Sequence, residues 1–435
     1  MTWVDQKQGS AKRALQGFNR DALFAVSMMV ATGFGFAKAI LLAALLPVEI
    51  YGFYIAAFGI ATLSGMVLSL GEIERTYKVY PKLDALGNGA AILGRAFALV
   101  RRLALRLLVC LAGVSALFEF YSPYGMGLAE VVTVMGVAML FMCQTLMASV
   151  IRAIDSLRIL PRFTAARGLV ALVVTTPVAI MTQDWILVLQ IEAFGIALVL
   201  LLFVLLVSAH PKVATEKGED VKPEELDDSE TRSGRLIYSA SLISALVPYG
   251  GRSALLAIDG PAMAGAFGVL NALVQVAQLL ASSLAQKLAP DLLKEAALRG
   301  DGARVGWLER FGVSLVLLWG TSIAVFLGTA ISFFWSEAFE FWAGYTITIP
   351  VLFITAIQMA MSAHLFLFFA VVSEDREKDL VFAAIATVFI FYTGLKAASF
   401  FSIGLPGYAA SAALASTAHT LYLAACYRRA LRANA

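Results

Sequence analysis

The stretch "FGFAKAILLAALLPVEIYGFY", from Phe34 to Tyr54, decides how this chain folds. Its first half continues an apolar run that begins near residue 22 and is long enough to cross the hydrocarbon core of a bilayer. A short turn at Pro47 separates this run from a second one, so the stretch predicts two adjacent transmembrane helices. Lys38 lies inside the first of them, where a cation is costly and therefore informative.

The composition of the whole chain predicts a polytopic membrane protein. Of its 435 residues, 60% are hydrophobic and 14% are charged, and the mean hydropathy is +0.82, far from the balance of a soluble protein. The first apolar run is too long for a signal-peptide core, so we expect it to remain as a helix. Apolar runs predict an all-α fold with twelve transmembrane helices at residues 22–46, 52–71, 98–118, 128–150, 164–182, 185–208, 236–258, 262–285, 310–332, 344–371, 380–401 and 407–426.

The lysines and arginines are divided unevenly between the two sides of the predicted bundle. All but three of the 33 lie on one side, in the tails and around the connections after even-numbered helices. The outer connections, such as "EFYSPYGMG" and "FFWSEAFEFWAGY", hold acidic and aromatic residues instead. The positive-inside rule therefore predicts a multi-pass protein of the plasma membrane with both termini in the cytoplasm.

One long hydrophilic insert divides the chain into two halves. It runs from His210 to Gly234, and its mixed charge without apolar periodicity predicts a solvated cytoplasmic linker, with a regulatory or binding segment as the alternative. The predicted domains are a six-helix lobe at 1–209, the linker at 210–234 and a second six-helix lobe at 235–435.

The two halves correspond to each other around one feature. "GFGFAKAILLAALLP" in the first half aligns with "VPYGGRSALLAIDGP" in the second, so Lys38 precedes Pro47 by as many residues as Arg252 precedes Pro261. Glycine residues interrupt the first helix just before its cation, and proline and glycine residues interrupt the second. Interrupted helices at matching places in two halves indicate a transporter's binding site, although small residues also allow close helix packing.

Three cations, Lys38, Arg252 and Lys396, lie inside predicted helices, about two-thirds of the way to the outer side. Such a residue near the bilayer centre costs about 2.5–3.5 kcal/mol on insertion scales. Helical side chains lean toward the N-terminus of their helix, here away from the nearer interface, which disfavours snorkelling. We expect the three cations to face a water-filled central cavity. Burial against an acid such as Glu192, or snorkelling, is the alternative.

A polar stripe on one predicted helix also suggests a binding surface. Asn271, Gln275 and Gln278 share one face of helix 262–285. They can bind sugar hydroxyls across a cavity or hold the helix to a neighbour. Arg75 and Lys287 follow the second helix of each half on the predicted cytoplasmic side and are candidates for a gate or for substrate entry.

A few titratable groups lie within the predicted helices. Glu192 can pair with a cation or take part in proton coupling. His364 and His419 titrate near neutral pH and can carry protons, although a lone membrane histidine is more often a packing residue. Glu192 and His364 are therefore candidate coupling residues.

The sequence lacks the signatures of an enzyme or a metalloprotein. It has no Gly-rich phosphate loop, no metal-ligand spacing and no nucleophile motif, and its three cysteines fall in apolar runs. The predicted outer loops are too short for the catalytic charge of a membrane glycosyltransferase or polymerase. We expect neither enzymatic activity, nor a metal or cofactor, nor nucleic-acid binding.

The segment "ILLAALLPVEIYGFYIAAFGIATLSGMVLSLGEIERTYKVYPKL" resembles the first two helices of the bacterial polysaccharide-biosynthesis flippases, the Wzx-like carriers of lipid-linked oligosaccharides. The residues that fit the family's pattern are Pro47, Tyr51, Gly52, Tyr54, Gly71, Glu74 and Arg75. The second half is similar to the family in "ALLAIDGPAMAGAFGVLNALVQVAQLLASSLAQKLAPDLLKEA". The chain departs from the family in lacking a Tyr common in the loop before helix 262–285 and in its longer, more charged linker.

The resemblance implies a fold like that of the multidrug and toxin extrusion (MATE) carriers, with two six-helix lobes around a cavity that opens alternately to either side. It implies an undecaprenyl-diphosphate-linked oligosaccharide as substrate, with Lys38, Arg252 and Lys396 where cationic cavity residues are expected. It also implies a bacterial inner-membrane location, contact with membrane lipids, and a polysaccharide polymerase and chain-length regulator as partners.

Three other functions remain open at this stage. A MATE-type cation-coupled multidrug exporter would share the fold, but such exporters usually need an intramembrane carboxylate, and only Glu192 is well embedded. A lipid II flippase usually has two more helices. A polytopic glycan polymerase would need larger outer loops than this sequence offers.

Overall fold

A computed structural model describes residues 27–28, 30–85, 89–118, 127–155, 158–214, 228–298, 303–372, 374 and 376–433. Within these ranges every regular element is a helix, and nine segments are long and apolar enough to cross a membrane. The helix at residues 30–45, α4 (Gly89–Phe118) and α17 (Leu405–Ala433) occupy the other three predicted spans. The all-α fold, with a helix at each predicted position, is therefore confirmed.

The first lobe extends from the N-terminal helix to α8. Its chain turns from α2 into α3 at Leu70 and Gly71, whose φ angles are 48° and 80°. Arg106 fixes this turn, because its guanidinium donates to the Leu68 carbonyl at 3.1 Å and pairs with Glu72. The helices that follow the N-terminal one are α2 (Val48–Ser69), α3 (Glu72–Ala85), α4, α5 (Leu128–Asp155), α6 (Ile159–Thr182), α7 (Trp185–Ser208) and α8 (Pro211–Ala214).

The second lobe contains two spans built from shorter pieces. The π-helical turn η2 joins α9 to α10, and the 3₁₀ turn η3 joins α14 to α15. The short helix α13 lies in a predicted outer connection. The elements are α9 (Asp228–Ala245), η2 (Leu246–Gly250), α10 (Gly251–Asp259), α11 (Pro261–Leu298), α12 (Ala303–Ser332), α13 (Ser336–Gly344), α14 (Ile349–Ala360), η3 (Met361–Ala363), α15 (His364–Val372), α16 (Glu377–Phe400) and α17.

About half of the predicted linker at 210–234 lies outside the described residues, which omit 215–227. Its two flanks are helical, since α8 and the start of α9 fall within it. The domain boundaries drawn from the sequence therefore stay a prediction.

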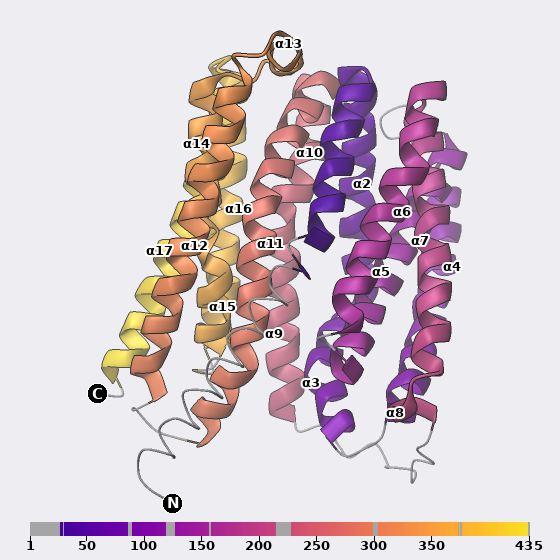
Figure 1. Ribbon diagram of the computed structural model, residues 1–435, viewed down its shortest axis with the longest axis vertical. Coiled ribbons are helices and arrows are strands. Elements are labelled where there is room, and N and C mark those ends of the chain that lie inside the picture. Colours follow the sequence, from indigo (N-terminus) through magenta and orange to yellow (C-terminus); the bar gives the residue numbers. More distant parts are fainter. Residues whose placement is uncertain are drawn as a thin grey trace, which may run out of the picture.

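Figure 1 shows the two lobes side by side, with their helices along the long axis of the molecule. Helices α4 to α7 form one side, and α12 and α14 to α17 form the other. Between them α2 packs against α10, η2 and α11. We call the end that carries α13 the outer end and the opposite end the inner end, following the positive-inside prediction.

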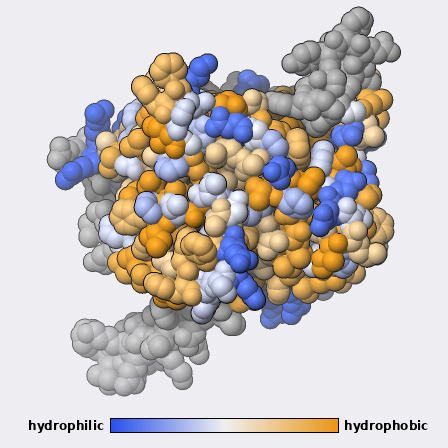
Figure 2. All heavy atoms as spheres, turned by 90° about the horizontal axis from the view of Figure 1, so that it is seen from above, coloured by the Kyte–Doolittle hydropathy of each residue, from blue (hydrophilic) through white to orange (hydrophobic). Residues whose placement is uncertain are grey.

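The lobes meet near the outer end through backbone contacts between α2 and α11, which we call the outer junction. A Cβ built on Gly52 would lie 1.8 Å from the carbonyl oxygen of Pro261, and one on Gly265 would lie 2.7 Å from that of Val48. Only a residue without a Cβ allows so close an approach. Seen from above, side chains fill this end of the molecule (Figure 2).

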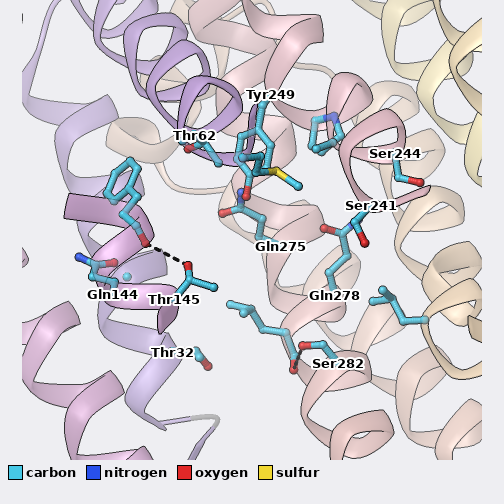
Figure 3. A pocket seen from close by; sticks show the side chains of 18 of the residues that line it. Thr32, Thr62, Gln144, Thr145, Ser241, Ser244, Tyr249, Gln275, Gln278 and Ser282 are labelled. Atoms are coloured by element: carbon cyan, nitrogen blue, oxygen red, sulfur yellow. Dashed lines mark hydrogen bonds between the residues drawn. The ribbon is translucent and has the colours of Figure 1, made fainter. Parts of the chain in front are cut away.

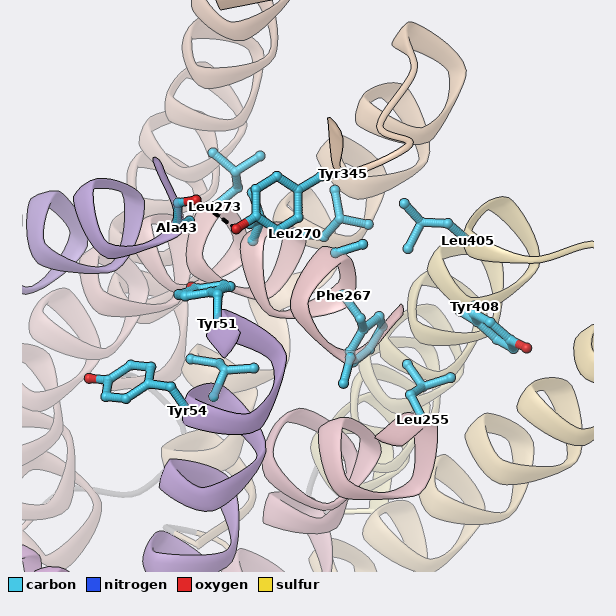
Figure 4. Close-up of a cluster of buried hydrophobic side chains, with 14 of the residues drawn as sticks. Ala43, Tyr51, Tyr54, Leu255, Phe267, Leu270, Leu273, Tyr345, Leu405 and Tyr408 are labelled. Carbon is cyan, nitrogen blue, oxygen red and sulfur yellow. Dashed lines mark hydrogen bonds between the residues drawn. The ribbon is translucent and has the colours of Figure 1, made fainter. Parts of the chain in front are cut away.

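Tyr345, just after α13, ties the second lobe to the first at the outer end. Its hydroxyl donates to the carbonyl of Ala43 at 2.6 Å, and its ring meets that of Tyr51 edge-on (Figure 4). The Ala43 carbonyl needs this donor because its helical partner would be the N–H of Pro47, and proline has none.

Candidate binding cavity

A large cavity lies between the two lobes and extends from mid-height to the inner end. Its volume is about 1670 Å³, above the range of about 300–1,000 Å³ typical of pockets for drug-sized ligands. Figure 3 shows polar side chains of both lobes around it, with Gln144 on one wall and Gln275 and Gln278 on the other. The residues of the outer junction named above do not line it. The cavity is therefore closed toward the outer end.

Lys38 lines the outer part of this cavity and is paired with an acid. Its ammonium forms an ion pair with the Glu192 carboxylate and donates to the Tyr54 hydroxyl at 3.1 Å. Tyr54 in turn donates to Glu192 Oε2 at 2.5 Å. Lys38 is 8% exposed and Glu192 3%. Lys38 thus lines the cavity but is buried against Glu192, the pairing that the sequence analysis named as the alternative.

Arg252 occupies the corresponding place in the second lobe. Pro248, which lacks an N–H, lies in the π-helical turn η2 that precedes it. Asn271 and Tyr392 donate to carbonyls of this turn, at 3.4 Å and 3.0 Å respectively. Such turns often mark functional sites. Side chains of α11 and α16 thus stabilise the π-helical turn η2 by hydrogen bonds to its backbone carbonyls.

Arg252 differs from Lys38 in having no acid beside it. Its side chain lines the cavity and is only 2% exposed, and its guanidinium lies 5.6 Å from the ring centre of Tyr249. Its Nε lacks a hydrogen-bond partner, and no described carboxylate lies within ion-pair distance. A buried cation without a counter-charge is unfavourable unless an anion or water reaches it. Arg252 therefore offers uncompensated positive charge to the cavity.

Arg167 is a cavity residue that the sequence analysis missed. Because it lies close to the start of the predicted helix 164–182, the sequence counts it among the cations of the cytoplasmic side. The helix α6 begins at Ile159, so Arg167 lies about 12 Å along it. Its guanidinium donates to Gln144 Oε1 at 3.1 Å and lies within electrostatic range of Glu192. The sequence signal that could have placed Arg167 correctly is the run of residues from Ile159 through Phe163, which continues the helix toward its N-terminus.

The three polar residues on α11 all line the cavity. Asn271 also donates to the Pro248 carbonyl, so it takes the packing role that was the alternative. Gln275 and Gln278 are partly exposed and face the cavity in Figure 3. Their role in binding a substrate stays a prediction.

His364 and His419 form a stacked pair rather than two lone histidines. Their ring centres are 4.7 Å apart with an interplanar angle of 21°, and both line the cavity. His364 Nδ1 donates to the carbonyl of Met361, which begins the turn η3. No pattern in the sequence indicates this contact, because the two residues lie on different helices.

The remaining predicted site residues lie in different environments. Arg75 lines the inner part of the cavity, where a gate was predicted, while the Lys287 side chain lies outside the described part. Lys396 is exposed and does not line the cavity, so the prediction that it faces the cavity is wrong. It lies four residues before the end of α16 at Phe400, about 6 Å of helix rise, and a lysine there can reach the outer interface by snorkelling.

The cavity carries more cationic than acidic side chains. The cations are Lys38, Arg75, Arg152, Arg167 and Arg252, and the acids are Glu74, Asp84 and Glu192. Burial raises the pKa of Glu74, which weakens the acidic contribution further. No group of three or more His, Cys, Asp or Glu residues suited to a metal ion occurs among the described residues. The arrangement favours an anion.

No family model matches the chain, and no curated protein matches it in sequence. Its fold, however, has counterparts among solved structures. One is an inward-facing multidrug resistance MATE family transporter of the MOP superfamily, at 11% identity and a TM-score of 0.64, covering 95% of this chain and 98% of the other. The fold is that of the MATE transporters.

Two further solved structures similar to this chain are informative. A multidrug resistance MATE family transporter in an outward-facing conformation gives a TM-score of 0.58 at 11% identity, covering 95% of this chain and 96% of the other. A MOP superfamily transporter from Pyrococcus furiosus gives 0.57 at 12% identity with the same coverage. That protein is described as having a binding pocket whose reverse polarity suggests a different function.

The MATE fold confirms the predicted architecture of two six-helix lobes around a central cavity. All three counterparts are described as transporters. The closer resemblance to the polysaccharide flippases stays a prediction.

Proposed function

We propose that this protein is an alternating-access carrier that moves an anionic lipid-linked oligosaccharide, attached to a polyprenyl diphosphate, outward across the bacterial inner membrane. The observation that carries the proposal is Arg252, a buried cation that lines the cavity without a carboxylate partner among the described residues. A diphosphate would supply the missing counter-charge, and guanidinium groups bind phosphate oxygens well.

The form of the cavity supports the same class of substrate. Its excess of cations attracts an anion, and its volume leaves room for a head group larger than a drug molecule. Gln275 and Gln278 can donate to and accept from sugar hydroxyls. The lipid tail can stay in the bilayer while the head group crosses, and rocking of the two lobes would open the outer end. A polysaccharide polymerase and a chain-length regulator would be its partners.

A MATE-type cation-coupled multidrug exporter is the second candidate. Two observations favour it: the fold is shared with multidrug transporters, and Glu192 is a buried carboxylate in the cavity wall. Glu192 is however already paired with Lys38. A cationic drug would therefore meet a neutralised acid beside the free charge of Arg252, which makes the anionic substrate the better match.

Arg252→Gln tests the proposal in proteoliposomes that contain a fluorescent polyprenyl-diphosphate oligosaccharide. A hydrogen bond to a charged group contributes about 1.5–3 kcal/mol, so we expect transport at low substrate concentration to fall about tenfold or more. Lys378→Gln is the matched control, since it removes an exposed cation of the same lobe that does not line the cavity. Equal transport by the two variants would contradict the proposal. Efflux of a cationic dye by the wild-type protein would favour the second candidate.

A further inference from the structure

The Glu192 carboxylate already pairs with Lys38 in the buried wall of the cavity, and the proposed function does not explain this pairing. Glu192 belongs to α7 and Lys38 to the N-terminal helix, and their ion pair lies in the cavity wall. The cation therefore already holds an anion, supplied by the protein itself. Any anionic ligand that binds Lys38 must compete with this carboxylate.

The contacts around the pair hold the carboxylate in place. Tyr54 donates to one Glu192 oxygen at 2.5 Å, while Lys38 contacts the other. The Lys38 ammonium also lies 5.2 Å from the ring centre of Phe58. Glu192 further lies within electrostatic range of Arg167, and Tyr54 within that of Arg252. Two further cations thus lie near the pair without being part of it.

We propose that Glu192 is a tethered competitor that sets a charge threshold for substrate binding, so that only a ligand with two or more negative charges displaces it from Lys38. This rests on the proposed function, because it assigns the specificity of the same cavity.

The physical reason is that a monoanion and a diphosphate differ in the number of charge contacts that they gain on binding. A monoanion would exchange one carboxylate contact for another and would leave Glu192 as a buried, unpaired charge, which is strongly unfavourable. A diphosphate can contact Lys38 with one phosphate and a guanidinium of Arg167 or Arg252 with the other. This second contact remains when Glu192 keeps Lys38, so the affinity for a diphosphate depends less on that carboxylate than the affinity for a monoanion does. Specificity then comes from an internal repulsive element as well as from attraction.

The experiment compares two probes on the purified full-length protein by calorimetry: inorganic pyrophosphate, which is multivalent, and dimethyl phosphate, a monoanion. We expect the wild-type protein to bind pyrophosphate and to discriminate strongly against dimethyl phosphate. In Glu192→Gln the affinity for dimethyl phosphate should rise at least tenfold, and that for pyrophosphate by a smaller factor. The double variant Lys38→Gln/Glu192→Gln should lose this gain, because the freed ammonium is its cause.

Asp84→Asn is the matched control. Asp84 also lines the cavity and also pairs with a lysine, Lys212, at 2.9 Å, but at the exposed inner end. We expect it to leave the ratio of the two affinities unchanged. The same gain in Asp84→Asn, or a gain that persists without Lys38, would overturn the inference, because either result would indicate a general effect of cavity charge.

Two further outcomes separate this inference from the proposed function. If pyrophosphate binds in a manner that depends on Arg252, but Glu192→Gln leaves the ratio of affinities unchanged, only the inference fails. If pyrophosphate binds neither the wild type nor any variant, both fail. Should Glu192→Gln not fold, Glu192→Asp keeps the charge but shortens its reach to Lys38, and it should give an intermediate gain for dimethyl phosphate.

Discussion

The same two helices, α2 and α11, form both the closed outer junction and part of the open inner cavity, and the two regions differ in chemistry. At the outer junction glycine brings the backbones into contact, as at Gly52 and Gly265. Toward the inner end Thr62 on α2 and Gln275 and Gln278 on α11 face the cavity instead. The outer junction is closed by the close packing of two backbones, while the inner cavity is lined by polar side chains that favour contact with water.

The difference separates two kinds of effect that a substitution can have. In the outer junction, a change alters how well the lobes fit together, and hence the balance between conformations. In the cavity, a change alters the charge and hydrogen bonds that a substrate meets. Variants of the outer junction should therefore affect stability or conformation, and variants of the cavity should affect affinity.

The largest effect is expected from Gly52→Ala. The added Cβ would lie 1.8 Å from the carbonyl oxygen of Pro261 and 2.6 Å from its carbonyl carbon, and backbone atoms cannot yield as a flexible side chain does. Overpacking typically costs about 1–3 kcal/mol. We expect a clear fall in the apparent melting temperature, followed by intrinsic fluorescence in detergent, or a shift toward conformations in which the outer junction is open.

Gly136→Ala on α5 is the control for this prediction. Nothing lies within 4 Å of a Cβ built there, and alanine is favoured over glycine within a helix by about 1 kcal/mol. Its melting temperature should stay the same or rise. If both variants behaved alike, the close contact of α2 with α11 would not be what closes the outer end.

The fold could be predicted well from the sequence because hydropathy and charge asymmetry are patterns that extend over many residues. Twenty apolar residues in a row, and a strong asymmetry of lysine and arginine, leave few alternatives for a membrane chain. Lys38 and Arg252 could be found for the same reason, since each departs from the composition that a bilayer imposes. The alignment of the two halves then indicated that Lys38 and Arg252 occupy corresponding positions.

The rest of the site depends on directions and contacts that no such pattern encodes. Lys396 and Lys38 lie at similar positions along their predicted helices, but the structure places Lys396 on the exposed face of α16. Arg167 could not be told from the arginines that set topology, because the start of its helix was placed too late. The pair of Lys38 with Glu192 joins residues 154 positions apart. The sequence names this pairing as an alternative, and the contact between the N-terminal helix and α7 decides for it.

A smaller effect is expected at the outer junction from Tyr345→Phe. The variant keeps the ring against Tyr51 but loses the hydrogen bond to the Ala43 carbonyl. Burial raises the pKa of the Tyr345 hydroxyl, so it is a donor throughout the physiological range. One such bond contributes about 0.5–1.5 kcal/mol, which would shift the balance between closed and open outer ends by up to about tenfold.

The measurement for Tyr345→Phe is the labelling rate of a cysteine at Ala264, a fully buried position next to the outer junction, in a background without the three native cysteines. An impermeant maleimide added from the outer side should react faster in the variant. Phe339→Leu serves as control, since Phe339 is an exposed residue of α13. An unchanged rate would mean that Tyr345 packs on the first lobe without holding it closed.

The smallest effect is expected from Lys396→Met, which compares a cation facing away from the cavity with Arg252, which faces into it. Because Lys396 is exposed and close to the end of α16, its removal should change stability by no more than about 0.5 kcal/mol. The affinity for pyrophosphate should be unchanged, whereas Arg252→Gln should lower it. A loss of affinity in Lys396→Met equal to that in Arg252→Gln would mean that α16 turns its lysine inward when substrate binds. The comparison therefore tests whether a cation of a membrane helix must face the cavity in order to bind the anion.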